Sequence, residues 1–260
     1  MSHTAAMNLG LAALRFFSGV PDAVRDALLS GGHEKRYAKG DLLFMQDTPA
    51  DKLFIVIDGW VKIYRTTPQG EEAVLALLKT GDAFGEASIF GHSLYPVSAT
   101  AAEDAAVFEI PGHLLRAQAK ASHEVMARVM DSMSRDLRNL QMENEHLALM
   151  SAPQRVGCLL LQFSSGTAGA GGSFTLPYDK SLAAARLGMK PETFSRALQA
   201  LKPVGVSVDG PRVTVASFGA LVDYCCTHCS ALPGECPGAR EGCDRAATCP
   251  GKKFIKISDK

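Results

Sequence analysis

The sequence predicts an α+β chain with an N-terminal β jelly-roll barrel, a long helix and a C-terminal winged helix-turn-helix. Three observations predict this order: short strands with regular turns, then a seven-residue apolar repeat, then a helical hairpin followed by a β-hairpin. We expect a barrel domain with N-terminal helices at 1–117, the long helix at 118–150, the winged helix at 151–218 and a cysteine-rich tail at 219–260.

Residues 33–110 contain short apolar runs separated by turn sequences such as Asp58-Gly59 and the Gly70 turn. Short strands at this even spacing are typical of a jelly roll, and such a barrel can enclose a ligand. The expected strands are Leu42–Met45, Leu53–Ile57, Trp60–Arg65, Ala73–Leu78, Ser98–Ala102 and Ala106–Ile110.

A seven-residue repeat begins at Ser122 and continues to about Met150, which predicts a coiled-coil seam in a homodimer. Asn144 supports pairing, because a lone polar seam residue is costly in a monomer core but fixes register across a two-fold. The alternative is a long core helix lying on the barrel, since methionines pack loosely. The seam residues are Met126, Met130, Met133, Leu137, Leu140, Asn144 and Leu147.

Residues 180–201 form two short amphipathic patterns joined at Gly188, which predicts a helix-turn-helix. In the second helix, Pro191 suits the first turn, while Phe194 and Leu198 belong to the buried face. The alternative is a helical hairpin inside another kind of domain. Beyond it, Val206–Val208 and Val213–Val215 alternate about Asp209-Gly210, which predicts a β-hairpin wing.

The opposite face of the second helix presents Glu192, Ser195 and Arg196, the side-chain types that read base edges in double-stranded DNA. Thr193 lies between them, and Lys180 and Lys190 are placed for phosphate contacts. The chain has 27 basic and 27 acidic side chains, so DNA affinity must come from a local patch rather than a global field.

Arg15 interrupts the one apolar run near the N-terminus that resembles a signal peptide, and no run elsewhere is long enough to span a membrane. We therefore expect a cytoplasmic protein with no membrane partner. No nucleophile, base and orienting group stand out together, so we do not expect an enzyme.

Together, the barrel, the Phe84-Gly85-Glu86 segment, the long helix, Arg155-Val156 and the Glu192–Arg196 motif resemble the Crp/Fnr family of bacterial transcription regulators. The resemblance covers roughly residues 10–220. It implies that Glu192, Ser195 and Arg196 read TTGA-type half-sites arranged as a palindrome, and that RNA polymerase is a partner. It also implies an effector pocket at Phe84, Gly85, Glu86 and Tyr95.

One departure from the family concerns its cyclic-AMP-binding members, which place an arginine about ten residues after Phe-Gly-Glu. Here that stretch is Tyr95–Ala99, and no arginine occurs between Thr66 and Leu115, so a cyclic phosphate lacks its charged partner. The stretch is closer to the dissimilatory nitrate respiration regulators, whose haem responds to nitric oxide. The sequence does not assign a haem ligand among His3, His33, His92, His113 and His123.

A second departure is the tail, where cysteines gather among glycines and prolines. In a reducing compartment this pattern favours a metal centre over disulfides. The candidates are an iron-sulfur cluster, a structural zinc site, or a tail that is disordered or redox-reactive. The family resemblance favours the cluster, although members of the family usually carry the cysteines near the N-terminus. The expected ligands are Cys225, Cys226, Cys229, Cys236, Cys243 and Cys249, whereas Cys158 is expected in a core.

Two function classes follow from these residues. The first is a homodimeric DNA-binding regulator that senses redox state, oxygen or nitric oxide through the tail, the barrel or both. The second is a regulator whose barrel binds a small organic effector, with the tail as a structural zinc site.

Overall fold

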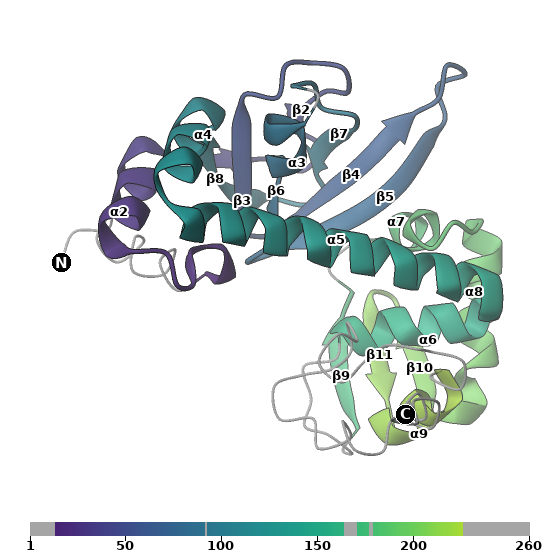
Figure 1. Ribbon diagram of the computed structural model, residues 1–260. Coiled ribbons are helices and arrows are strands. Elements are labelled where there is room, and N and C mark those ends of the chain that lie inside the picture. The colour runs from purple at the N-terminus through teal and green to yellow at the C-terminus, as the bar shows by residue number, and fades with distance from the viewer. Residues whose placement is uncertain (1–13, 92, 164–170, 177–178, 226–260) are drawn as a thin grey trace, which may run out of the picture. The chain divides into compact units, whose positions relative to one another are not determined.

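The computed structural model describes residues 14–91, 93–163, 171–176 and 179–225. The chain divides into two compact units, residues 1–137 and 138–260, and the division falls within the long helix α5 (His123–Leu149) (Figure 1). Helices and strands are mixed along the chain, which confirms the predicted α+β class. Among the described residues, no helix is long and apolar enough to cross a membrane.

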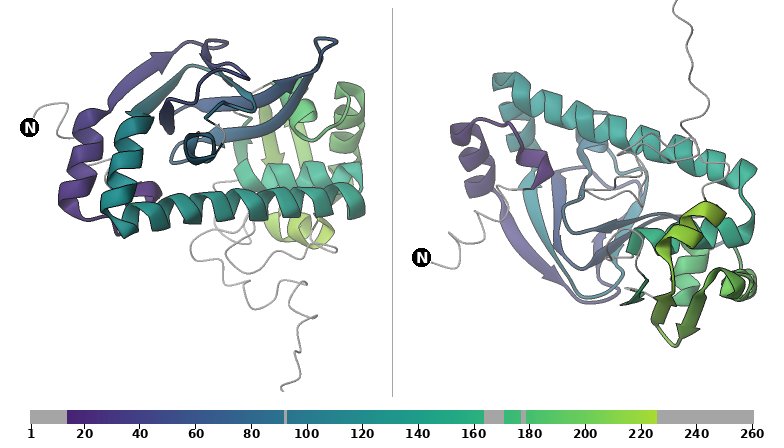
Figure 2. Two further views of the ribbon diagram at one scale, coloured as in Figure 1. Left: turned by 45° about the horizontal axis from the view of Figure 1, so that its top comes forward. Right: turned by 90° about the horizontal axis from the view of Figure 1, so that it is seen from below.

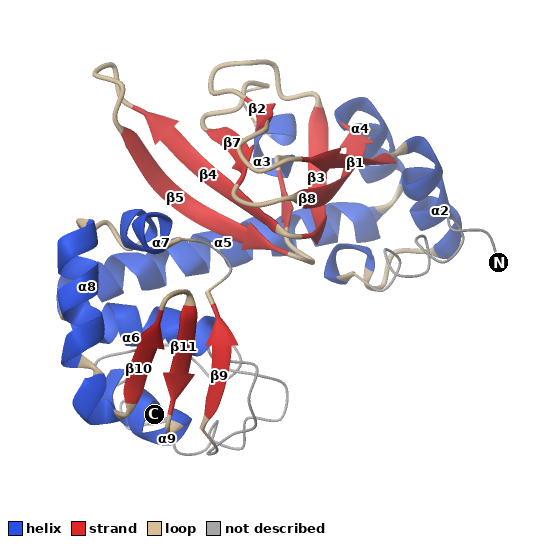
Figure 3. Cartoon of the chain, turned by 180° about the vertical axis from the view of Figure 1, so that it is seen from behind, coloured by secondary structure: helices blue, strands red, loops and turns tan. Residues whose placement is uncertain are grey.

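Two four-stranded antiparallel sheets form the first unit, as the jelly-roll prediction requires (Figure 3). The first sheet has the order β1 (His33–Tyr37), β8 (Ala105–Pro111), β3 (Lys52–Asp58) and β6 (Ala83–Phe84). The second has the order β2 (Leu42–Phe44), β7 (Ser98–Ala101), β4 (Trp60–Thr66) and β5 (Glu72–Lys79).

Strand β3 is buried on both faces, because it separates two hydrophobic cores. Phe54 and Val56 point between the two sheets, while Leu53 and Ile55 belong to the core under the helices. Side chains of a strand alternate between its faces, so a continuous apolar run serves both cores. The helical core involves η1 (Arg15–Phe17), α2 (Asp22–Gly31), α3 (Glu86–Phe90), α4 (Gly112–Ala121) and the start of α5; α2 and α4 lie side by side (Figure 2).

The six expected strands of the barrel agree with the observed strands to within one residue at each end. The sequence did not identify β1, α3 or α4. Strand β1 reads His-Glu-Lys-Arg-Tyr and lies at the edge of its sheet, where charged residues are common and hide the apolar alternation.

The second unit contains the predicted winged helix-turn-helix, with one strand more than expected. Its helices are α6 (Ala152–Phe163), α7 (Lys180–Arg186), α8 (Pro191–Ala200), η2 (Lys202–Val204) and α9 (Phe218–Cys225), and its sheet has the order β10 (Val206–Asp209), β11 (Arg212–Val215), β9 (Gly172–Thr175). The β10–β11 hairpin confirms the predicted wing. Strand β9, which the sequence did not predict, pairs with β11 despite its glycine.

Helix α9 begins where the sequence predicted the start of the tail, and it packs against α6. Gly157 of α6 makes this close approach possible: a Cβ atom at this position would lie 2.3 Å from Sγ of Cys225. The apolar character of Phe218–Cys225 was visible in the sequence, but the segment was assigned to the tail because a group of cysteines follows it.

Candidate nucleic-acid interface

Local capping signals fix the two helices of the helix-turn-helix. The Asp179 carboxylate caps α7 by accepting a hydrogen bond from the backbone N–H of Leu182 at 2.8 Å. Gly188 adopts φ +61° in the turn, a conformation that favours glycine. Lys190 then takes the N-cap position of α8 with extended backbone, and Pro191 opens the helix.

Helix α8 has the two faces that the sequence predicted. Phe194, Ala197 and Leu198 are buried against the domain core, and α6 and α7 pack on this side. The recognition face, defined as Glu192, Thr193, Ser195 and Arg196, is exposed. Glu192, Ser195 and Arg196, which the sequence predicted to read bases, make no side-chain hydrogen bond or ion pair with the described residues, so their polar groups are available to a ligand.

The lysines expected to contact phosphate flank the recognition face along the chain. Lys190 is exposed at the start of α8, and Lys180 is half-buried at the start of α7. A helix with base-reading side chains near its N-terminus and cations beside it has the composition of a major-groove reader.

Two contacts that the sequence did not reveal hold α7 in place. The Arg155 guanidinium on α6 donates from Nη1 to the carbonyl oxygen of Leu187 at 2.9 Å, which satisfies the end of α7. Arg186 of α7 forms an ion pair with Glu143 of α5. Asp179 was recognisable as an N-cap before a helical pattern, but the partners of Arg155 and Arg186 are distant in sequence and carry no local signal.

The long helix α5 has one buried and one exposed apolar face. Val125 and Val129 are buried in the helical core of the first unit, and Met126 packs partly against it. The predicted seam residues Met130, Leu137 and Leu140 are 62%, 58% and 59% exposed. Met133, Asn144 and Leu147 are exposed as well. Large apolar side chains aligned at this exposure are unusual on the surface of a monomer.

The residues of the predicted effector pocket lie in packed surroundings rather than around an open interior. Tyr95 stacks on Phe44 with ring centroids 3.8 Å apart, and Phe54 stacks on Phe84 at 5.1 Å. The Tyr95 hydroxyl donates to the carbonyl oxygen of Lys52 at 2.9 Å. At Gly85, φ is +98° and a Cβ atom would lie 2.9 Å from that same carbonyl oxygen. These aromatic rings occupy much of the space between the sheets.

Glu86 is the buried carboxyl group of this region, with 1% of its surface exposed. Burial raises its pKa to about 7, and the nearby Asp136 adds to the rise, while the Ser132 hydroxyl and Arg135 act in the opposite direction. Its Oε1 atom has no hydrogen-bond partner among the described residues. Ser132, Arg135 and Asp136 all belong to α5, so the protonation of Glu86 affects the contact between α3 and α5.

Raising the pH is expected to weaken this contact. The folded protein binds the Glu86 proton more tightly than the unfolded chain does, so protonation of Glu86 stabilises the folded state. This contribution to the free energy of unfolding is fully present below the ordinary carboxyl pKa of 4.5 and is lost as pH rises through about 7. In denaturant unfolding, the wild type should lose about 2–3 kcal/mol more than Glu86→Gln between about pH 5 and about pH 8. Parallel pH profiles for the two proteins would show that Glu86 does not titrate in this range.

The histidines and cysteines considered as haem or metal ligands are described only in part. His33, His113 and His123 are exposed at the surface, outside the core between the sheets, whereas His3 and His92 lie outside the described residues. Cys158 is buried in α6, as predicted. Cys225 is buried at the end of α9, and the remaining predicted metal ligands lie outside the described residues. Within the described residues, no three His, Cys, Asp or Glu side chains form a metal-binding group.

Comparisons with known proteins agree with this architecture. Residues 34–122 match the Cyclic nucleotide-binding domain family, and residues 154–224 match the Crp-like helix-turn-helix domain family. The CRP-like cAMP-activated global transcriptional regulator of Mycobacterium tuberculosis is 30% identical over 192 residues, covering 72% of this chain and 85% of the relative. The Anaerobic regulatory protein of Pasteurella multocida is 28% identical over 194 residues, covering 73% and 71%. A candidate cyclic-nucleotide-binding protein of Ruegeria pomeroyi has a similar structure, with 34% identity, a TM-score of 0.64 and coverage of 86% and 99%.

A jelly-roll domain joined to a helix-turn-helix with a free recognition face defines a DNA-binding regulator of transcription. The chain belongs to the Crp/Fnr family, whose members regulate transcription and are not enzymes.

Proposed function

We propose that this regulator acts as a homodimer paired along α5. The observation that supports this proposal is the exposed apolar face of α5, where Met130, Leu137 and Leu140 continue the seven-residue repeat and are more than half exposed. Burying this face against a second copy removes apolar surface from water, and Asn144 fixes the register of the two helices. Two recognition helices related by the resulting two-fold match a palindromic site.

The recognition face of α8 reads the DNA in this proposal. Arg196 donates to guanine, Glu192 accepts from cytosine and Ser195 serves either role, as the family resemblance implies for TTGA-type half-sites. Lys180 and Lys190 contact phosphates, and Thr193 lies among the base-reading residues. The support is the exposure of Glu192, Ser195 and Arg196 and their lack of side-chain partners among the described residues. RNA polymerase is the further partner that the family implies.

We further propose that the cysteine-rich segment holds an iron-sulfur cluster that responds to redox state, oxygen or nitric oxide. Cys226 and Cys229 bring two thiolates to one centre, and Cys236, Cys243 and Cys249 supply the others. The buried thiol of Cys225 packs against Gly157, so it serves the helix contact better than a metal. The name of the Pasteurella relative, an anaerobic regulator, is consistent with such a signal. Zinc at the same thiolates and haem in the barrel are the alternatives.

Replacing Cys226 and Cys229 together with serine is expected to abolish metal loading, because both thiolates are needed to hold a cluster or zinc. Iron, acid-labile sulfide and the visible spectrum are measured on anaerobically purified protein. A brown wild type that air bleaches identifies the cluster, and a colourless zinc protein identifies the structural alternative. Cys225→Ala should load metal normally. Metal-free wild type would remove the tail from the sensing mechanism.

The second candidate is a small organic effector in the barrel, favoured by the match of residues 34–122 to the Cyclic nucleotide-binding domain family. The absent arginine and the stacked Phe44 and Tyr95 argue against a cyclic nucleotide. Titration with cyclic AMP or cyclic GMP to millimolar concentration is expected to give no saturable heat and no gain in DNA affinity. Micromolar binding would favour this second candidate.

A further inference from the structure

A pocket lies on the outer face of the second sheet, away from the aromatic core of the barrel. Its volume is about 580 Å³, and we define the outer pocket by the residues its chemistry depends on: Leu42, Met45, Gln46, Tyr64, Arg65 and Ser98. Along β4 and β7 the alternate residues Ile63 and Ala99 face the core between the sheets, so Tyr64 and Ser98 face outward.

Irregular strand pairing shapes this pocket. The register shifts between Leu42 and Phe44 where β2 pairs with β7, and again between Ile63 and Tyr64 where β4 pairs with β5. Bulges of this kind re-aim side chains and are frequent beside functional sites. Here they accompany the outward-facing Leu42 and Tyr64.

Polar groups without protein partners line one side of the outer pocket. The Oε1 atom of Gln46 is buried and has no hydrogen-bond partner among the described residues, although the Gln46 backbone N–H donates to Oγ of Ser98 at 2.9 Å. Arg65 is exposed, and its guanidinium forms no ion pair with the described residues. A buried acceptor without a donor is costly. A ligand that supplies an N–H or O–H group to this oxygen, as the Gln46 side chain turns toward the pocket, therefore gains binding energy.

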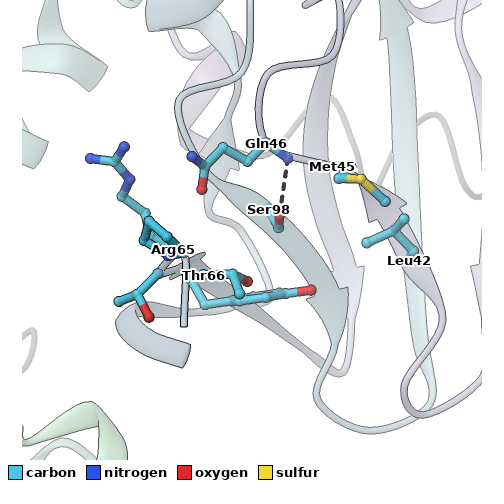
Figure 4. Close-up of a pocket in the computed structure, with 9 residues that line it drawn as sticks. Leu42, Met45, Gln46, Arg65, Thr66 and Ser98 are labelled. Atoms are coloured by element: carbon cyan, nitrogen blue, oxygen red, sulfur yellow. Dashed lines mark hydrogen bonds between the residues drawn. The ribbon is translucent and has the colours of Figure 1, made fainter. Parts of the chain in front are cut away.

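Apolar side chains line the opposite side. Leu42 and Met45 are 44% and 54% exposed, and they lie across the pocket from Gln46 and Arg65 (Figure 4). The volume falls within the range of small-molecule sites, and an apolar wall with a few converging polar groups is their usual composition.

We propose that the outer pocket binds a small organic carboxylate that has an apolar body and a hydrogen-bond donor beside the carboxylate. The carboxylate pairs with Arg65, the donor reaches Oε1 of Gln46, and the apolar body lies against Leu42 and Met45. An N-acylated amino acid has these three groups in this order. None of the residues that define the outer pocket belongs to the recognition face, to the predicted metal ligands of the tail or to the predicted effector residues of the barrel.

The test is calorimetric titration of the full chain with N-acetyl-L-phenylalanine. We expect saturable binding at one site per chain, and binding about 10-fold weaker to Arg65→Gln, which removes the charge, or to Gln46→Leu, which removes the acceptor. Arg36→Gln, on β1 of the other sheet, is the matched control and should bind as the wild type does.

Two altered ligands test the same groups from the other side. N-acetyl-L-phenylalanine methyl ester lacks the carboxylate charge, so its affinity should not change in Arg65→Gln. The N-methylated acid lacks the hydrogen-bond donor, so its affinity should not change in Gln46→Leu. Arg65→Lys keeps the positive charge and should recover part of the affinity. The absence of saturable heat for the wild type, or equal affinity of wild type and Arg65→Gln for the acid, would overturn the proposal.

Discussion

Replacing Leu140 with glutamate is expected to convert the protein to a monomer and to abolish binding to a palindromic operator. Leu140 is 59% exposed on α5 in the single chain, so the substitution should leave the fold of each chain intact. In a dimer paired along α5, two carboxylates would face each other across the seam after loss of apolar contacts on both sides. Sedimentation gives the mass, and a fluorescent duplex gives the DNA affinity.

Leu149 offers a matched control for this experiment. It lies on the same helix with the same exposure of 59%, but outside the seven-residue repeat. Leu149→Glu should therefore remain dimeric and bind the operator. An unchanged dimer for Leu140→Glu would assign the repeat to contacts within the chain, and dissociation of both variants would point to general damage to the helix.

Replacing Arg196 with alanine is expected to cost about 1–3 kcal/mol for each half-site and to flatten discrimination between bases there. Arg196 is exposed in the middle of α8, and its guanidinium has no side-chain partner in the described residues, so its loss should leave the domain folded. Affinities for a palindromic TTGA-type duplex and for a random duplex are compared at one salt concentration, because phosphate contacts depend on salt.

Two further variants separate base reading from phosphate contact. Lys190→Ala should weaken binding to both duplexes alike and reduce the salt dependence, because a lysine contact to phosphate carries no sequence information. Gln199→Ala, exposed near the other end of α8, should change neither. Equal losses by Arg196→Ala on specific and random DNA would refute the assignment of base reading.

Local sequence signals predicted most of the fold. These signals are short-range: a glycine turn at Gly188, a proline at the helix start at Pro191, and apolar alternation in the barrel strands each depend on a few neighbouring residues. The observed elements agree closely with them. Strand β9 was missed because its pairing with β11 depends on a segment far along the chain and overrides the low strand propensity of Gly172. The hydrogen bond from Arg155 to Leu187 is likewise a product of tertiary packing.

The interior of the barrel was harder to predict than its strands. Between its terminal residues Lys52 and Asp58, strand β3 is entirely apolar, and residues 53–56 are buried, so no polar residue reveals which side chains point between the sheets. The sequence therefore predicted an effector pocket at Phe84 and Tyr95, but not the stacking of Tyr95 on Phe44. The outer pocket was not predicted either, because strand irregularities and the unsatisfied Oε1 atom of Gln46 leave no pattern in one sequence.

The contact between Gly157 and Cys225 makes the side-chain size allowed at one position depend on the side-chain size at the other. A methyl group at residue 157 would collide with the thiol, so the two side chains share a fixed amount of space between α6 and α9. Natural variation at one position should therefore depend on the other. Relatives with alanine or serine at residue 157 are expected to carry a smaller residue at 225, and those that keep glycine can keep the cysteine even where the later cysteines are absent.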